Sequence, residues 1–502
     1  MIFFEGSTLT LAQTLWLLAP EIVLLATGLL LLALHALRSR QEQEQDQDQE
    51  NERWPVYVAL GGFVAALGAA VSLWGCNTQG LLAAFSCDPF ALTSKIVALG
   101  GMGIVALMSD DYIRARRPRR QAEFYALLLF CSLPMCLMAS ATDLILIFLA
   151  FEFLNITSYI LTGYLRDDVR SVEAAIKYFL YGSTLSVVML FGVSWFYGLT
   201  GATDLRTIAA VLIDAENVLR PTLLPALIFV LVGLAYRVGA VPFHQWAPDA
   251  YEGAPTPVAA FLSVGPKVAG FTVILRLLLT ALPVDLVLAL DWRTLLIAIS
   301  VLTMTLGNLV ALWQDNIKRL LAYASIAQTG YILIGVVIAS PRGVTAVLLY
   351  LITYVATNLG VFAAVIAFSN QTGSDEIEDY AGLGKRAPLL AMGLFICLLS
   401  LVGIPLTAGF VGKGYLFLAA IEEGLLWMLV IGAVNHVISL AYCWKVIRAM
   451  YLVPAQEEEP ISTSPMLAVS LGITVAGVLF IGVFPGSFIA LVQAAAPLFL
   501  GG

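Results

Sequence analysis

Five charged side chains stand inside long apolar stretches of this 502-residue chain. They are one acid and four bases: Glu152, Lys177, Arg237, Lys267 and Lys413. A charged side chain at the middle of a bilayer costs about 2.5–3.5 kcal/mol on insertion scales, so such residues are rare unless they are paired or functional. A row of titratable groups within one helical bundle is typical of a proton or ion path.

A static ion pair between Glu152 and one base, which would lock two helices together, is the alternative interpretation. It accounts less well for Lys267 and Lys413, because the sequence offers no further carboxylate at a similar depth to neutralise them. Other charged residues lie close to expected helix ends and are interpreted as interfacial or as reaching the surface with a long side chain: Glu21, Lys95 and Arg276.

The composition places the whole chain in a membrane. Hydrophobic residues make up 60% of it and charged residues 12%, about half the charged fraction of soluble domains. Helices of about 20 apolar residues each leave no room for a soluble nucleotide-binding, hydrolase or dehydrogenase domain. The six cysteines form no CxxC pair and the three histidines are scattered, so we expect neither an iron–sulfur cluster nor a haem in this chain.

Apolar windows predict an all-α polytopic fold with about fourteen membrane helices. The first is interpreted as a membrane helix, because it lacks the basic region and cleavage site of a signal peptide. The polar tract 38–53, rich in Gln, Glu and Asp, is expected to be a disordered connection. The predicted helices lie at 15–37, 55–75, 90–108, 123–141, 144–164, 173–199, 222–241, 256–278, 294–313, 320–339, 343–369, 389–419, 424–451 and 465–499.

The basic residues of the connections predict the orientation. Fourteen Lys and Arg residues fall in connections on one side and four on the other, and the richer side is expected to face the cytoplasm. With an even number of helices, both termini are then periplasmic or luminal. Cys76 and Cys87 flank a loop on that oxidising side, where a disulfide between them and a reduced pair are equal alternatives.

The seventh and twelfth predicted helices look interrupted by a proline close to a basic residue: Pro242 directly follows residue 241 at the end of the seventh, and Pro405 lies inside the twelfth. Proline removes a backbone donor, which a membrane helix tolerates where protein or water satisfies the freed carbonyls. Each broken helix is the fourth of a five-helix block, and the blocks are offset by an odd number of helices, so they predict an inverted repeat. The expected parts are 1–122, with three helices; 123–278 and 294–451, the two repeats; and 465–502, the last helix.

Two histidines are candidates for proton uptake or release at the membrane surface: His244 and His436. His244 lies in a polar, aromatic segment between helices seven and eight, beside Asp249 and Glu252. The alternative is a capped turn in which the imidazole and the carboxylate only satisfy backbone groups.

Several motifs are similar to those of the antiporter-like membrane subunits of respiratory complex I and its photosynthetic relatives. The resemblance extends over about residues 120–450, and Lys413 fits the N-type branch better than the M type. The expected end of the chain after helix fourteen also lacks the lateral helix of the L type. The motifs are PheGluPheLeuAsnIleThrSerTyrIleLeuThrGlyTyr (151–164), GluAlaAlaIleLysTyrPheLeuTyrGly (173–182), the segment 241–257, the segment 316–331 and GlyIleProLeuThrAlaGlyPheValGlyLys (403–413).

The resemblance implies a proton-pumping module without a redox centre, driven by quinone reduction elsewhere in a complex. It makes Glu152 the acid of the fifth helix, Lys177 the lysine of the sixth, Lys267 the central lysine of the eighth and Lys413 the lysine near an exit half-channel. Arg237 stands where the family usually has the lysine partner of that acid. Because a guanidinium effectively never loses its proton, we expect it to act as a permanent charge that moves between Glu152 and Lys267.

The resemblance also implies partners: other membrane-arm and peripheral-arm subunits and membrane lipid, with no nucleic acid. Flavin, iron–sulfur clusters and quinone are expected in the partner subunits, and NADH, NADPH or ferredoxin as electron donor. The expected location is a bacterial inner membrane or, alternatively, a thylakoid membrane. A subunit of a secondary cation/proton antiporter and a structural subunit with an inactive channel are the rival functions.

Overall fold

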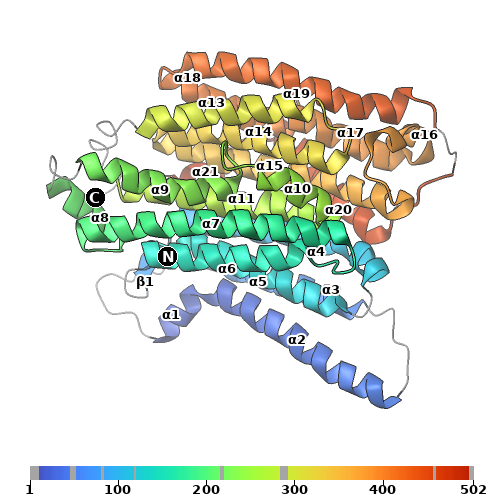
Figure 1. Cartoon of the computed structure of the whole chain (residues 1–502), viewed down its shortest axis with the longest axis horizontal. Coiled ribbons are helices and arrows are strands. Elements are labelled where there is room, and N and C mark those ends of the chain that lie inside the picture. The colour runs from blue at the N-terminus through green and yellow to red at the C-terminus, as the bar shows by residue number, and fades with distance from the viewer. Residues whose placement is uncertain are drawn as a thin grey trace.

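The computed structural model describes residues 11–45, 53–80, 84–117, 120–214, 220–282, 292–455 and 459–496. Nearly all of the structure is helical, and the long helices run side by side with the N-terminal helices on one flank and α18 and α19 on the other (Figure 1). Twelve helices of the described part are long and apolar enough to cross a membrane. The predicted all-α polytopic fold is confirmed.

The N-terminal part contains a small antiparallel hairpin between membrane helices. Its strands pair Thr78 with Cys87, and both Cys76 and Cys87 are free thiols in the structure. Asp88 begins the next helix, because its carboxylate accepts a hydrogen bond from the backbone N–H of Ala91 at 2.7 Å and thereby caps an otherwise unpaired donor. The elements are α1 (Leu11–Leu17), α2 (Ala19–Gln45), α3 (Trp54–Ser72), β1 (Thr78–Gly80), β2 (Phe85–Cys87) and α4 (Pro89–Arg116).

The remaining helices follow the predicted order. Residues 120–282 contain α5 (Gln121–Ser140), α6 (Leu144–Thr162), α7 (Val169–Thr200), α8 (Leu205–Asp214), α9 (Arg220–Val238), α10 (Trp246–Gly253) and α11 (Thr256–Thr280). Residues 292–496 contain α13 (Trp292–Ala311), α14 (Ile317–Ile338), α15 (Pro341–Thr372), the 3-10 helix η2 (Ile377–Tyr380), α16 (Leu383–Arg386), α17 (Pro388–Val402), α18 (Ala408–Glu422), α19 (Leu426–Leu452), α20 (Pro465–Val483) and α21 (Gly486–Ala495).

The seventh and twelfth helices are broken, as their prolines predict. The seventh ends as α9 and resumes as α10 after an unwound segment, 239–245. The twelfth divides into α17 and α18 around Gly403, whose φ of 96° is a left-handed conformation that only glycine adopts without strain. The inverted relation of the two five-helix blocks, and the division of the chain into four parts, stay predictions.

Three helices form the centre of the bundle. Every residue in the apolar stretch of α11 is buried, as are 94% of those in α14 and 89% in α15, whereas α7 on the outside buries only 33%. Small residues allow close contact between α13 and α14: a Cβ added at Gly307 would lie 2.6 Å from the backbone nitrogen of Ala327. Such contacts between small residues are the usual way in which membrane helices approach each other.

Neighbouring helices cover three residues expected to be interfacial or to reach the surface, so the expectation that they are exposed is wrong. Lys95 Nζ lies 2.7 Å from Glu21 Oε1, with side chains 0% and 6% exposed. Arg276 donates two hydrogen bonds to the buried carboxylate of Asp88, at 2.9 and 3.1 Å. The position of a residue near a helix end does not reveal whether neighbouring helices cover its side chain. A charged side chain that is covered requires a partner of opposite charge.

Two boundary predictions also need correction. Helix α2 continues to Gln45, so the disordered connection predicted from residue 38 is wrong over 38–45, because glutamine and glutamate are good helix formers and no glycine or proline interrupts them. Residues 46–52 of that tract lie outside the described part. The last predicted helix is divided into α20 and α21 at Pro485, and its final residues 497–499 lie outside the described part.

Candidate functional site

Glu152 and Arg237 are connected through the amide of Asn155. Asn155 lies one turn after Glu152 on α6 and donates to its carboxylate at 3.0 Å. The amide oxygen accepts a hydrogen bond of 2.7 Å from Arg237 Nη1. Asp143 fixes the start of this helix by accepting from the backbone N–H groups of Ile145 and Leu146. The expected direct pairing of Glu152 with Arg237 is therefore replaced by a bridge of one amide.

Arg237 is completely buried at the end of α9. Its Nη atoms also approach the hydroxyls of Tyr178 on α7, at 3.2 Å, and Ser158 on α6, at 3.4 Å. All three acceptors are neutral, and no carboxylate in the described chain forms an ion pair with this guanidinium. The structure thus places a permanent positive charge beside Glu152 while leaving the carboxylate unpaired with it.

Lys267 lies in the middle of the buried helix α11, with a residue exposure of 3%. Its ammonium donates to the backbone carbonyl of Ser325 and to the hydroxyl of Thr329, at 2.8 Å, both on α14. It also lies 5.8 Å from the ring centroid of Tyr354. Among the described residues no carboxylate pairs with it, so neutral oxygens and an aromatic ring are its whole polar environment.

Thr329 links Lys267 to the break in the seventh helix. Its hydroxyl donates a hydrogen bond of 2.7 Å to the carbonyl of Val238, the residue that follows Arg237. The Thr329 hydroxyl thus accepts a hydrogen bond from Lys267 and donates one to the carbonyl at the broken end of α9. On the other side, the Ser325 hydroxyl contacts those of Tyr354, at 2.8 Å, and Tyr251, at 3.3 Å, which extends the polar chain from α10 to α15.

Lys413 lies on α18 immediately after the break in the twelfth helix and is 2% exposed. Its ammonium donates to the carbonyls of Leu401 and Val402, both at 2.9 Å, and lies 4.7 Å from the ring centroid of Tyr331. The last carbonyls of a helix have no intrahelical partner and carry the negative end of its dipole. The break therefore creates the acceptors that hold this buried cation.

Gln328 shares a hydrogen-bond acceptor with Lys413. It is on α14 between the residues that contact Lys267, and its side-chain N–H donates to the carbonyl of Leu401 at 3.2 Å. Leu401 is also an acceptor for Lys413, and Tyr350 donates to the amide oxygen of Gln328. Helix α14 thus carries polar groups at the sites of both lysines, while among the described residues no hydrogen bond joins Gln328 to Lys267 or to its acceptors. The polar groups around Glu152, Arg237, Lys267 and Lys413 are together called the buried row.

The two histidines have different surroundings. His436 on α19 lies against the break in the twelfth helix, where a Cβ on Gly403 would be 2.7 Å from His436 Nε2 and 3.2 Å from Lys413 Cδ. His244 is 9% exposed in the break of the seventh helix, and its backbone carbonyl accepts from Ala247 at 3.0 Å. The structure brings His436 to the buried row, and it gives the His244 backbone the role of a cap for α10.

Lys177 does not join the row. Its side chain on α7 is 51% exposed and pairs with Glu173 at 2.8 Å and Asp249 at 3.0 Å. Asp249 also accepts from Arg319 at 2.9 Å, and these residues line a surface cavity of about 260 Å³. Burial raises the pKa of the Asp249 carboxyl, but the hydrogen bonds and charges of Lys177 and Arg319 outweigh it and hold that pKa below its ordinary value.

Sequence reasoning from charged residues missed the neutral members of the row. Asn155, Ser325, Gln328 and Thr329 carry no charge, but each lies in an otherwise apolar helix. Ser325, Gln328 and Thr329 follow at spacings of three and four residues, which places them on one face of α14. A polar stripe on a buried helix is the signal that would have found them, because unpaired polar groups in a bilayer are costly.

Comparison with known proteins shows the family of this chain. Residues 141–439 match the family model described as NADH:quinone oxidoreductase/Mrp antiporter, TM. The chain belongs to this family. The matched residues include both breaks and every member of the buried row, and the resemblance inferred from the motifs is confirmed.

Individual relatives of the NADH:quinone oxidoreductase/Mrp antiporter family cover 80% to 95% of the chain. NADH-quinone oxidoreductase subunit N of Trichlorobacter lovleyi is 38% identical over 95% of this chain and 96% of its own length. NAD(P)H-quinone oxidoreductase subunit 2 of Synechocystis is 43% identical over 80% of this chain and 77% of its own. A chain in the structure of respiratory complex I from Thermus thermophilus is similar with a TM-score of 0.78 and 29% identity, over 95% of this chain and 100% of that chain.

Proposed function

We propose that this chain is a proton-translocating membrane-arm subunit of an NADH- or ferredoxin-driven quinone oxidoreductase. The observation that carries the proposal is the pair of buried lysines, Lys267 and Lys413. Neutral oxygens and aromatic rings surround both, and α14 contributes polar side chains to both sites: Thr329 contacts Lys267, and Gln328 shares the Leu401 carbonyl with Lys413. A desolvated lysine without a carboxylate partner can release its proton, whereas a structural ion pair would hold it.

Each residue has a role in proton transfer that follows from its chemistry. Glu152 accepts a proton on the side of the fifth helix, and Lys267 and Lys413 carry it through the centre and to the twelfth helix, with water filling the gaps between them. Arg237 keeps its charge and controls the protonation of its neighbours by its position. His436 lies beside Lys413 and is placed to release or take up the proton there.

Lys177 and His244 support the path from outside the buried row. Lys177 belongs to the exposed cluster with Asp249 and Arg319. There it adds a positive charge to the surface next to α10. His244 lies in the break of the seventh helix and is the corresponding candidate for uptake.

Coupling requires partners. Moving one charge against 100 mV costs about 2.3 kcal/mol, and no described residues of this chain form a cluster of His, Cys, Asp and Glu able to hold a metal ion. Other membrane-arm subunits and a peripheral arm with flavin, iron–sulfur clusters and quinone would supply the driving reaction, in a bacterial inner membrane or a thylakoid membrane.

The test is donor-driven proton uptake in inverted vesicles, with quinone reduction followed in the same sample. Lys267→Ala in the intact complex is expected to lower both rates together by at least tenfold, and Lys385→Ala, an exposed lysine outside the row, is expected to change neither. Unaltered rates in Lys267→Ala would mean an inactive channel. Sodium-dependent proton flux without quinone would instead favour the cation/proton antiporter.

A further inference from the structure

A polar cavity and an apolar groove meet at one arginine on the outside of the bundle. The cavity measures about 330 Å³ and lies among α15, η2, α16 and the segment before α20. The groove measures about 790 Å³ and runs between α17 and α20. Arg386 and Ile461 line both hollows, so together they form one site with a polar end and an apolar length.

The groove faces outward from the bundle. Its helices touch where a Cβ on Gly393 would lie 2.7 Å from the Leu471 side chain, and they leave a furrow on the outer side of this contact. Leu389 at the rim is 79% exposed, and apart from Arg386 and Thr463 every lining residue is apolar. In a membrane such a surface meets acyl chains.

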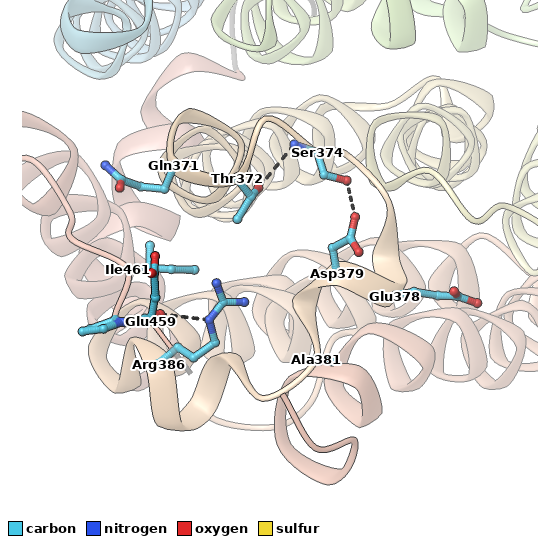
Figure 2. A pocket seen from close by; sticks show the side chains of 10 residues that line it. Gln371, Thr372, Ser374, Glu378, Asp379, Ala381, Arg386, Glu459 and Ile461 are labelled. Atoms are coloured by element: carbon cyan, nitrogen blue, oxygen red, sulfur yellow. Dashed lines mark hydrogen bonds between the residues drawn. The ribbon is translucent and has the colours of Figure 1, made fainter. Parts of the chain in front are cut away.

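The polar cavity presents charges of both signs. Arg386 and Asp379 both line the cavity, and Figure 2 shows them on opposite sides of it, with the Asp379 carboxylate turned to Ser374 and Glu378 directed away. Arg386 Nε donates to the carbonyl of Glu459 at 3.1 Å, and its two Nη groups have no partner in the described chain. Asp379 accepts from the Ser374 hydroxyl through one oxygen, which leaves the other available.

We propose that this site binds a glycerophospholipid with a primary-amine headgroup, of the phosphoethanolamine class. The Nη groups of Arg386, which have no partner among the described residues, suit a phosphate, because a guanidinium donates two parallel hydrogen bonds to it. The Asp379 carboxylate suits the ammonium, and one acyl chain lies in the groove between α17 and α20. In the predicted orientation Lys385 and Arg386 face the cytoplasm, so the lipid belongs to the inner leaflet.

A partner's transmembrane helix is the competing occupant. Ala468, Gly472 and Ala476 repeat every four residues along the groove, a spacing that allows helices to pack closely. A packed helix would account for the small residues but not for a two-sign cavity that continues from the end of the groove. The lipid accounts for both features.

The test is photo-crosslinking of the intact complex in vesicles. The probe is phosphatidylethanolamine with a diazirine on one acyl chain, compared with phosphatidylglycerol and phosphatidylcholine carrying the same group. We expect crosslinks within 388–396 and 468–479 at a yield at least threefold higher for phosphatidylethanolamine. Equal yields for the three lipids would overturn the proposed headgroup recognition.

Variants separate the two ends of the site. Arg386→Ala is expected to lower the crosslink yield at least fivefold, with the neighbouring Lys385→Ala as a matched control that changes nothing. Asp379→Asn is expected to lower the crosslink yield of phosphatidylethanolamine to that of phosphatidylglycerol. Indifference of the yield to both Arg386→Ala and Asp379→Asn would overturn the polar end of the site.

The groove has its own pair of variants. A Cβ at Gly472, which lines the groove, and one at Gly61 on the lipid side of α3 would each meet no atom within 4 Å. Gly472→Leu therefore fills the groove without a backbone clash and is expected to abolish the crosslinks, while Gly61→Leu leaves them unchanged. Absence of crosslinks in the assembled wild-type complex, with a partner helix mapped to Gly472 instead, would replace the lipid by that helix.

Discussion

At the scale of single residues, the departure from an ion pair at Arg237 is the most informative feature. The Arg237 guanidinium donates to one amide and approaches two hydroxyls. Among the described residues, Asn155 is the group that connects it to Glu152. The amide bridge separates the carboxylate from the permanent cation, so the two groups interact through Asn155 and not as a direct ion pair.

Charge and hydrogen-bonding geometry at Arg237 can be separated by two substitutions. Arg237→Lys retains the charge and is expected to keep at least half of the pumping rate. Arg237→Met leaves the Asn155 oxygen and the Tyr178 hydroxyl without their donor, so it should lower pumping at least tenfold and stability by about 1–3 kcal/mol. Proton uptake and thermal unfolding of the complex measure the two effects. Equal loss in both variants would show that the forked donor geometry, and not the charge, is required.

At the scale of elements, the two broken helices create the polar sites. The end of α17 supplies the carbonyls that bind Lys413, and the end of α9 supplies the Val238 carbonyl that binds Thr329 beside Lys267. In each case unwinding frees backbone acceptors inside the bundle, and side chains of the neighbouring helices satisfy them. The break therefore serves as a binding site for a cation or for the hydroxyl that holds one.

Gly403 tests the break in the twelfth helix. Gly403→Ala places a Cβ against His436 and Lys413 in a left-handed backbone conformation, and should lower stability by about 1–2 kcal/mol and proton pumping severalfold. Gly201→Ala has the same kind of positive φ, 69°, in open space at the end of α7, so it should cost similar stability with unchanged pumping. Loss of pumping in both variants would attribute the effect to general destabilisation.

At the scale of the whole molecule, two buried ion pairs connect the N-terminal helices to one another and to α11, the helix of Lys267. Glu21 on α2 pairs with Lys95 on α4. Asp88, which begins α4, pairs with Arg276 on α11, the helix that carries Lys267. Because α4 takes part in both pairs, a displacement of the N-terminal helices would be transmitted to the central helix.

Removing one partner of the first pair tests this attachment. Glu21→Gln leaves the Lys95 ammonium buried without its carboxylate, which is expected to cost about 3–5 kcal/mol. The double variant Glu21→Leu with Lys95→Met replaces both charges by apolar groups and should recover most of that stability. Thermal unfolding of the purified complex gives the comparison. A single variant as stable as the wild type would contradict a buried, mutually dependent pair.

The sequence by itself determined the membrane fold, the order of its helices, the two breaks and the charged members of the row. These are local properties, because an apolar window specifies a span, a proline interrupts a helix at its own position, and a charge inside an apolar stretch is visible without any neighbour. The motif similarity determined the family for the same reason, since it compares residue types along the chain.

Only the tertiary structure decided which of these residues meet. Asn155 and Arg237 are 82 residues apart and Lys267 and Ser325 are 58 apart, so their contacts depend on how helices pack and not on local sequence. Packing placed Lys177 at the surface and Glu21 with Lys95 in the interior, against expectations drawn from their positions along the chain. Whether a side chain is buried depends on the residues that the fold places around it. A charged side chain requires a partner only once it is buried, so the need for a partner also follows from the tertiary structure.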